Sequence, residues 1–312
     1  MPPLRFPIAA ITDEFSTDDL DAALDAMLSV GMTGAELRLV YGRNVVDLTD
    51  TELDRARAAV EARGMRVLGI ASPVLKCVLP NGPPIDARFQ QDVFGSAYTY
   101  EDQPRLATRA LEVAARVGAP LIRVFSGWRT VDPAALTETI AAELRGLAER
   151  AHGHGVTIGL ENEHACNVGT GAEAARMLAA VQHPGVGLIW DPANASILGE
   201  EPFPDGYAAL PPGRVIHVHA KDCMVNGHTP AWGPLGEMAI DWSGQIGALA
   251  RDGYAGAISL ETHWRGKDGG QAHHPPILWT CCLVMRVNLG RVLINRQPNA
   301  DLDAPPDVRY WG

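Results

Sequence analysis

The chain has 312 residues, of which 46% are hydrophobic and 20% are charged, so it contains enough apolar side chains for a large buried core. Asp and Glu number 37 against 26 Lys and Arg, which gives a formal net charge of −11. Because no run of basic residues offsets this charge, the composition excludes nucleic acid as an expected partner.

Short apolar runs alternate along the chain with longer segments of helical periodicity, which is the pattern of parallel βα units. The apolar runs predict eight strands, at residues 6–12, 34–39, 66–71, 120–125, 156–160, 186–190, 214–219 and 256–260. The periodic segments predict helices at residues 18–29, 50–63, 103–117, 133–152, 171–181, 242–251 and 276–292. We therefore predict the α/β class and a (β/α)8 TIM barrel. Residues 1–312 are expected to form a single domain, with a C-terminal helix and tail at residues 270–312.

Two helix starts carry polar capping signals. Thr49 is followed three residues later by Glu52, the spacing of a capping box at the start of the second helix. Asp132 precedes Pro133, which predicts a side-chain cap and a proline in the first turn of the fourth helix. After the sixth strand, residues 200–212 are rich in proline, and we expect a loop with a short helix there.

Two connections are unusually long, at residues 73–102 and residues 224–239. Both contain proline, glycine and aromatic residues and follow strand ends, so they would lie over one mouth of the barrel. They could cover a substrate there, and a surface excursion or an oligomer contact are the alternatives.

Neither membrane insertion nor export is predicted. No uninterrupted apolar run reaches the roughly 18 residues of a membrane span, and residues 1–11 lack the apolar core and cleavage site of a signal peptide. We therefore expect a cytoplasmic protein without a membrane partner. Five cysteines without a Cys-x-x-Cys pair predict reduced thiols rather than disulfides or a thiolate zinc site; these are Cys77, Cys166, Cys223, Cys281 and Cys282.

Four successive predicted strands each end at a side chain that can bind a metal ion. These side chains are Glu161, Asp191, His219 and Glu261, at the ends of the fifth to eighth strands. Because the carboxyl ends of parallel barrel strands converge on one face, the four can meet in space. Three carboxylates and one imidazole form a mostly oxygen ligand set that suits Mn²⁺, Mg²⁺, Co²⁺ or Fe²⁺. We expect one divalent metal, with Mn²⁺ as the first choice.

Each ligand has a more ordinary interpretation or a competitor. A single carboxylate at a strand end is more often a helix cap or a surface group. Glu163 lies two residues after Glu161 and shares its side of the strand. His217 shares a face with His219 but lies deeper, so we predict a hydrogen-bonded interior histidine that supports the site.

Other polar residues near strand ends are candidates for substrate binding. Lys221 follows His219 by two residues, and Glu237 lies in a loop that reaches the same face. Glu36 and Arg123 come from earlier strand ends, where Arg38, Lys76 and Trp128 could also line a pocket. Surface or structural ion pairs are the alternative roles for these residues.

Several short strings together resemble the xylose isomerase-like sugar epimerase and isomerase superfamily. The strings are GLEN at residues 159–162, WDPAN at 190–194, HVHAKD at 217–222, PLGE at 234–237, IDW at 240–242 and GYAGAISLE at 253–261. The organisation is similar over residues 6–265, and the motifs are specific mainly between residues 156 and 262. Members include ketose 3-epimerases, hydroxypyruvate isomerase-like proteins and inosose dehydratase.

The resemblance implies a barrel whose metal ligands are Glu161, Asp191, His219 and Glu261. It also implies that the two glutamates flank the substrate and move its proton, so Glu161 and Glu261 are the predicted catalytic residues. The chain departs from the ketose 3-epimerases at two sites. Asn194 stands where they have a histidine three residues after the metal aspartate, and we predict that it binds substrate. Val225 stands where they have an arginine.

The expected function is that of a divalent-metal-dependent sugar or keto-sugar epimerase or isomerase. The metal would stabilise an enediolate while the glutamate pair acts as acid and base. The alternative is a lyase, either a dehydratase or an enzyme that performs β-elimination on a keto-glycoside or keto-polyol. DNA repair of the endonuclease IV type is disfavoured by the acidic charge and the single ligand set, and a non-enzymatic binding protein would need no metal. We expect a small-molecule sugar as partner and a homodimer as the assembly.

Overall fold

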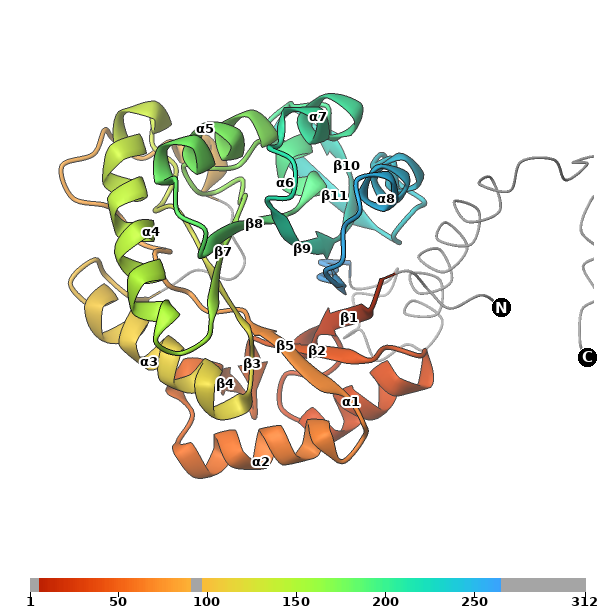
Figure 1. The fold of residues 1–312 in the computed structure, drawn as a ribbon. Coiled ribbons are helices and arrows are strands. Elements are labelled where there is room, and N and C mark those ends of the chain that lie inside the picture. The colour runs from red at the N-terminus through yellow and green to blue at the C-terminus, as the bar shows by residue number, and fades with distance from the viewer. Residues whose placement is uncertain (1–5, 91–96, 265–312) are drawn as a thin grey trace, which may run out of the picture.

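The computed structural model describes residues 6–90 and 97–264. Eight parallel strands close into a barrel, in the neighbour order β1-β12-β9-β8-β7-β6-β5-β2 with β2 returning to β1 (Figure 1). These strands are β1 Ile8–Ile11, β2 Gly34–Leu37, β5 Arg66–Ile70, β6 Leu121–Val124, β7 Thr157–Glu161, β8 Val186–Trp190, β9 Val215–Ala220 and β12 Ile258–Leu260. Each predicted strand overlaps one of them, so the (β/α)8 barrel is confirmed.

Helices surround the barrel on its outside (Figure 1). The helices are α1 Leu20–Ser29, α2 Asp50–Glu61, α3 Gln103–Val117, α4 Thr137–His152, α5 Gly171–Val181, α6 Pro192–Ile197, α7 Tyr207–Ala209 and α8 Trp242–Arg251. Shorter turns are η1 Thr12–Glu14, η2 Val45–Asp47, η3 Ala87–Phe89, η4 Pro133–Leu136 and η5 Pro202–Gly206. The helix predicted at residues 276–292 and the tail at 270–312 lie outside the described residues.

The two capping predictions had different outcomes. Thr49 and Glu52 form a complete capping box at the start of α2, so that prediction is confirmed. The prediction for Asp132 was wrong, because its side chain makes no capping hydrogen bond. The chain enters a 3-10 turn there, and the second part of the prediction is confirmed, because Pro133 stands in its first turn.

Helix α6 was not predicted from the sequence. It has six residues, begins at Pro192, and is capped by Asp191, whose Oδ1 accepts a hydrogen bond from the backbone N–H of Asn194 at 3.0 Å. Proline at the first helical position is well tolerated because that N–H has no partner within a helix. The aspartate that ends β8 therefore also fixes the start of the next helix.

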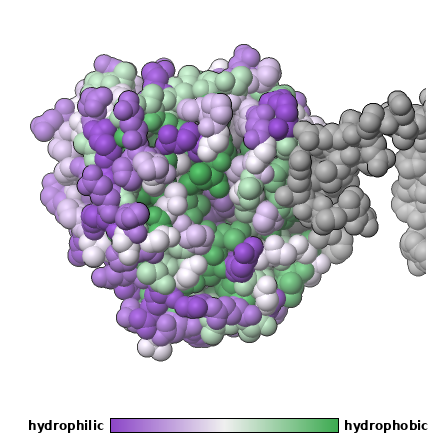
Figure 2. All heavy atoms as spheres, viewed as in Figure 1, coloured by the Kyte–Doolittle hydropathy of each residue, from purple (hydrophilic) through white to green (hydrophobic). Residues whose placement is uncertain are grey.

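The apolar side chains form a core inside the barrel and between the barrel and its helices. Strands β1, β2, β6 and β8 are buried along their whole length, as expected for parallel strands covered on both faces. Figure 2 shows hydrophilic residues over most of the outer surface in that view, with apolar residues gathered toward the hollow in the middle. Among the described residues, no helix combines the length and the hydrophobicity that a membrane span requires.

A β-hairpin stands over the end of β9. It consists of β10 Asp222–Asn226 and β11 Thr229–Gly233, paired antiparallel. The buried Asp222 carboxylate accepts hydrogen bonds from the backbone N–H groups of Cys223, Gly236 and Ile240, at 3.0, 2.7 and 3.0 Å. One side chain thus holds both the start of the hairpin and the loop that follows it, which positions the hairpin relative to the barrel.

A stability prediction concerns the contact between α5 and η5. At Gly171, the first residue of α5, a Cβ atom would lie 2.3 Å from the carbonyl oxygen of Gly206. This neighbour is backbone and cannot rotate away, so we expect Gly171→Ala to lower the free energy of unfolding by about 1–3 kcal/mol. Urea denaturation measures this difference.

The matched control is Gly146→Ala in the middle of α4, where a Cβ atom would meet nothing within 4 Å. This variant should gain about 0.5–1 kcal/mol, because alanine is the better helix former. Equal effects of the two substitutions would contradict the close approach of α5 and η5.

Candidate metal centre

Four adjacent strands bring the predicted ligands to one point at the carboxyl end of the barrel. Glu161 ends β7, Asp191 directly follows β8, His219 lies in β9, and Glu261 directly follows β12. One ligand atom from each lies within 4.8 Å of the others, and all four side chains are buried. The structure therefore assembles the expected set of three carboxylates and one imidazole.

The contacts within this cluster fit a divalent cation. His219 Nδ1 lies 3.0 Å from Glu161 Oε1 and 3.3 Å from Glu261 Oε2. Glu161 Oε2 and Asp191 Oδ2 are buried without a hydrogen bond among the described residues, and they have only ionic neighbours. Buried carboxylate oxygens are normally hydrogen-bonded, so two such atoms beside one imidazole nitrogen form a set of donors that a cation would satisfy.

The second nitrogen of the ligand histidine faces a buried glutamate. His219 Nε2 lies 3.1 and 3.2 Å from the two oxygens of Glu36. Glu36 also contacts His217 Nε2 at 3.1 Å, and that nitrogen lies 3.0 Å from Ser259 Oγ. A carboxylate behind a metal-binding histidine fixes the ring and its tautomer. Glu36 can therefore hold His219 with Nδ1 turned toward the other ligands, and His217 is the supporting histidine that the sequence predicted.

Three cationic side chains surround Glu261. Arg38 Nη1 and Arg123 Nη1 lie 2.9 and 3.3 Å from its Oε1, and Lys221 Nζ lies 3.3 Å from its Oε2. Lys221 Nζ also lies 2.8 Å from Asp191 Oδ2. Buried charges are tolerated only when they are paired, so these cations compensate the carboxylates that the barrel brings together.

Burial and ion pairing shift the pKa values of the cluster's side chains in opposite directions. Burial raises the pKa of Asp191 to about 6, although Lys221 opposes the change. Burial also opposes ionisation of Glu261, but Lys221 and His219 outweigh it and hold its pKa well below the usual range. Burial disfavours the charged ring of His219, but Glu36 and the ligand carboxylates outweigh it and raise its pKa well above normal. Because a metal needs deprotonated ligands, protons and cation compete here.

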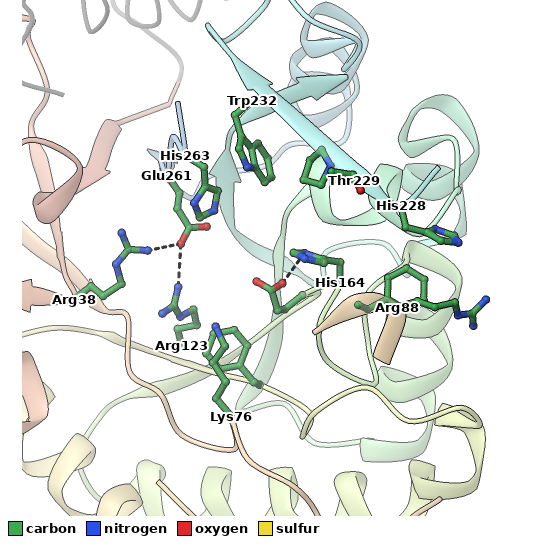
Figure 3. Close-up of a pocket in the computed structure, with 14 residues that line it drawn as sticks. Arg38, Lys76, Arg88, Arg123, His164, His228, Thr229, Trp232, Glu261 and His263 are labelled. Carbon is green, nitrogen blue, oxygen red and sulfur yellow. Dashed lines mark hydrogen bonds and ion pairs between the residues drawn. The ribbon is translucent and has the colours of Figure 1, made fainter. Parts of the chain in front are cut away.

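A pocket of about 150 Å³ lies beside this centre, and one of the four side chains, Glu261, lines it (Figure 3). Both long connections contribute to its wall, the first through Lys76 and Phe89 and the second through His228 and Trp232. Of the alternatives considered for these connections, covering a substrate is the one that this position favours.

The residues predicted to bind substrate lie at different depths. Arg123 lines the pocket, whereas Lys221 is buried between Asp191 and Glu261. Glu36 is 0% exposed and has its oxygens against the two histidines. Its surroundings therefore suit the orientation of His219 better than contact with a substrate.

The other two predicted residues are Asn194 and Glu237. Asn194 is fully buried, and its Oδ1 lies 2.9 Å from His164 Nδ1. Glu237 is exposed in the turn after β11, and it is not among the described residues that line the pocket. The structure therefore places Asn194 beside a histidine that the sequence reasoning missed, and it does not bring Glu237 to the site.

His164, Trp232 and His263 are among the pocket residues that were not predicted. His164 Nδ1 lies 2.7 Å from Glu163 Oε1. His263 is two residues after Glu261, and that spacing along an extended chain could have indicated it. Its ring lies 4.6 Å from that of Trp232 on the hairpin, a contact for which the sequence carries no signal.

Comparisons with known proteins agree with the barrel. The family model described as xylose isomerase-like TIM barrel matches residues 24–279. No curated protein matches the chain significantly. The chain spans 47% of a xylose isomerase-like TIM barrel/4-hydroxyphenylpyruvate dioxygenase fusion protein, at 18% identity over 98% of this chain and a TM-score of 0.66.

Other solved structures match over nearly their whole length. D-psicose 3-epimerase with D-tagatose, from Clostridium cellulolyticum H10, is 15% identical over 93% of this chain and 97% of its own, with a TM-score of 0.61. The probable 3-DHS dehydratase AsbF of Bacillus anthracis is 17% identical over 90% and 98%, with a TM-score of 0.65. A xylose isomerase-like TIM barrel protein from Mycobacterium smegmatis in complex with magnesium is 18% identical over 93% and 97%, with a TM-score of 0.65. At these identities the likeness shows the fold alone.

A metal-binding prediction compares a predicted ligand, Glu161, with Glu36, the residue behind another predicted ligand. Glu161→Gln removes a charged ligand, and Glu36→Gln leaves the ligands intact but weakens the hold on His219. We expect Glu36→Gln to reduce Mn²⁺ affinity by roughly 10- to 100-fold, and Glu161→Gln to reduce it by more than that. Titration calorimetry with Mn²⁺ measures both affinities.

The control is Glu138→Gln, which removes an exposed carboxylate on α4. It should bind Mn²⁺ like the parent protein. Unchanged affinity in Glu161→Gln would refute the ligand assignment, and unchanged affinity in Glu36→Gln would refute the orienting role.

Proposed function

We propose that this chain, which belongs to the xylose isomerase-like TIM barrel family, is a divalent-metal-dependent enzyme that enolises a sugar or keto-sugar, as an epimerase or isomerase. The observation that carries the proposal is the meeting of Glu161, Asp191, His219 and Glu261 beside a pocket that Glu261 lines. Mn²⁺ is the proposed metal, with Mg²⁺, Co²⁺ and Fe²⁺ as alternatives. A cytoplasmic location and a homodimer remain predictions.

The bound metal and the two glutamates would have different roles in the proposed reaction. A bound divalent cation supplies Lewis acidity, which makes a C–H beside a carbonyl more acidic. Glu161 and Glu261 are the two carboxylates that can take that proton and return it. Return to the opposite face of the same carbon is epimerisation, and return to the neighbouring carbon is isomerisation. The positions of the two glutamates on β7 and after β12 put one on each side of the ligand set.

Arg123 is the residue best placed to hold a substrate oxygen. It lines the pocket and lies 3.2 Å from Glu161 Oε2 and 3.3 Å from Glu261 Oε1. Its Nε–H is buried and has no acceptor among the described residues. An unpaired buried donor is costly, so a substrate oxygen that accepts from it would be bound with a net gain.

The size of the pocket supports a small substrate. A cavity of about 150 Å³ is comparable to one that holds a single benzene molecule. It is suited to one sugar-sized molecule, and a polymer such as DNA could place no more than one residue in it. This supports a sugar or keto-sugar as partner over the endonuclease alternative.

The second candidate is a lyase acting on a related keto-polyol or keto-glycoside. The observation that favours it is a further proton-transfer group in the pocket, the Glu163–His164 pair. Elimination uses such a group to protonate the departing oxygen, whereas epimerisation moves only a proton on carbon and needs only the carboxylates. One of the structural neighbours is a probable dehydratase.

The function can be tested by hydrogen exchange in deuterated water. The Mn²⁺-loaded protein is incubated with a panel of ketohexoses, inososes and 3-keto-glucosides, and deuterium at the carbon beside the carbonyl is followed by NMR. We expect exchange with at least one member of the panel. Glu161→Gln and Glu261→Gln should slow it by roughly 10²- to 10⁴-fold, because each removes a proton-transfer group.

Glu138→Gln and the protein treated with a chelator are the controls, and only the second should lose exchange. Deuterium in a recovered stereoisomer or aldose–ketose pair indicates an epimerase or isomerase, and release of water or an aglycone indicates a lyase. The absence of exchange across the panel would overturn the proposed function.

A further inference from the structure

A histidine–glutamate pair lines the pocket without belonging to the metal ligands. Glu163 and His164 lie shortly after the end of β7, and both side chains are largely buried, at 9% and 13% exposed. Figure 3 shows His164 across the cavity from Glu261 and Arg38, and Glu163 lines the same pocket. A sugar-sized substrate that fills this pocket therefore touches the metal ligand Glu261 on one side and this pair on the other.

The ring of His164 is held in a defined orientation. Its Nδ1 lies 2.7 Å from Glu163 Oε1 and 2.9 Å from Asn194 Oδ1. Both acceptors are fixed in turn, because the N–H of Ala165 donates to Glu163 Oε1 at 3.2 Å and the N–H of Asn194 donates to Asp191 Oδ1 at 3.0 Å. Two oxygen acceptors at one nitrogen require that Nδ1 carries the proton.

The other ring nitrogen is available to a substrate. Within the described ranges, 6–90 and 97–264, His164 Nε2 has no hydrogen-bonding partner, although the ring lines the pocket. A histidine that serves only the packing of a core normally has both nitrogens satisfied. A base or acid that is oriented by a carboxylate, with its free nitrogen in a pocket, is the arrangement found in proton-transfer catalysis.

The charges around His164 favour its protonated form. Burial opposes a charged ring, but Glu163 outweighs it and Asn194 adds to the effect, while Lys221 acts against them. The net result is a raised pKa for His164. At neutral pH the ring therefore carries a proton on Nε2 in a larger share of molecules than a free imidazole would, and that proton can be donated.

We infer that His164 is a general acid of this site, and that the site catalyses β-elimination from a ketone bearing an oxygen substituent at the β carbon. One of the carboxylates Glu161 and Glu261 takes the proton from the carbon beside the carbonyl. The electron pair of that C–H bond forms the C=C bond as the C–O bond at the β carbon breaks. His164 Nε2 delivers its proton to the departing oxygen, which leaves as water or an alcohol. The products are this molecule and an unsaturated ketone, and no oxidant or reductant is consumed.

The inference rests on the enolisation in the proposed function, and it selects the second candidate given there, the lyase, over epimerisation and isomerisation. It names the substrate class as keto-polyols and keto-glycosides with a β-oxygen. Epimerisation of the same ketone would leave His164 without a role, because it moves only a proton on carbon, which the carboxylates remove and return.

The test compares two leaving groups in His164→Gln. The probes are methyl 3-keto-β-D-glucoside, whose alkoxide must be protonated to leave, and 4-nitrophenyl 3-keto-β-D-glucoside, whose phenolate leaves unprotonated. Deuterium exchange at C2 and release of the aglycone are measured together in deuterated water with the Mn²⁺-loaded protein. His164→Gln should keep C2 exchange, lose methanol release by roughly 10²- to 10⁴-fold, and lose far less of the 4-nitrophenol release.

Controls separate a chemical role from a structural one. His152→Gln replaces an exposed histidine at the end of α4 and should behave like the parent protein. Thermal unfolding and Mn²⁺ content confirm that His164→Gln is folded and loaded, and its retained C2 exchange reports an intact metal centre.

Three results would overturn the inference. They are unchanged release of both aglycones by His164→Gln, equal loss of both, and exchange by the parent protein without release of either. If the parent protein exchanges no hydrogen in any ketone, the proposed function fails as well, and this outcome is distinguished from the others by the missing deuterium.

Discussion

The barrel brings several buried carboxylates together at the carboxyl ends of its strands. The rest of the site depends on how their negative charges are neutralised. An unpaired buried charge would be destabilising by several kcal/mol. An arginine or a lysine side chain lies against Glu161, Asp191 and Glu261. Arg38 shows the pattern most clearly, since it bridges Asp13 and Glu14 on one side and Glu261 on the other.

The charge pairs that neutralise the cluster also hold its side chains in position. Glu36 lies behind His219 and sets which nitrogen faces the ligands. Lys221 lies between Asp191 and Glu261, so a cation that binds there shares these oxygens with an ammonium group. The predicted ligands are therefore held by charge pairs that need no metal, and a centre that would reorganise little on binding a cation suits electrostatic catalysis.

Much of this could be predicted from the sequence, for reasons that individual residues make clear. The strands are short apolar runs bounded by polar residues, and each predicted ligand lies at or next to the end of one. The fold and the meeting of Glu161, Asp191, His219 and Glu261 therefore followed from the same pattern. The barrel and the resemblance are confirmed by the strand order of the structure and by the family model.

What could not be predicted depends on contacts between distant segments. The short helix α6 exists because Asp191 also serves as its cap, and a six-residue helix has too little periodicity to be visible. His164 gains its environment from Asn194, 30 residues later in the chain, and Trp232 reaches the pocket only because β10 and β11 form a hairpin. Neither spacing nor composition encodes such contacts.

The proposed metal centre requires one ion between Glu161, Asp191, His219 and Glu261. Crystals soaked in Mn²⁺ and measured near the manganese absorption edge locate that ion by its anomalous scattering. The account predicts a single strong peak at roughly 2.0–2.3 Å from His219 Nδ1 and from an oxygen of each of the three ligand carboxylates. A peak elsewhere, or none between these four side chains, would contradict it.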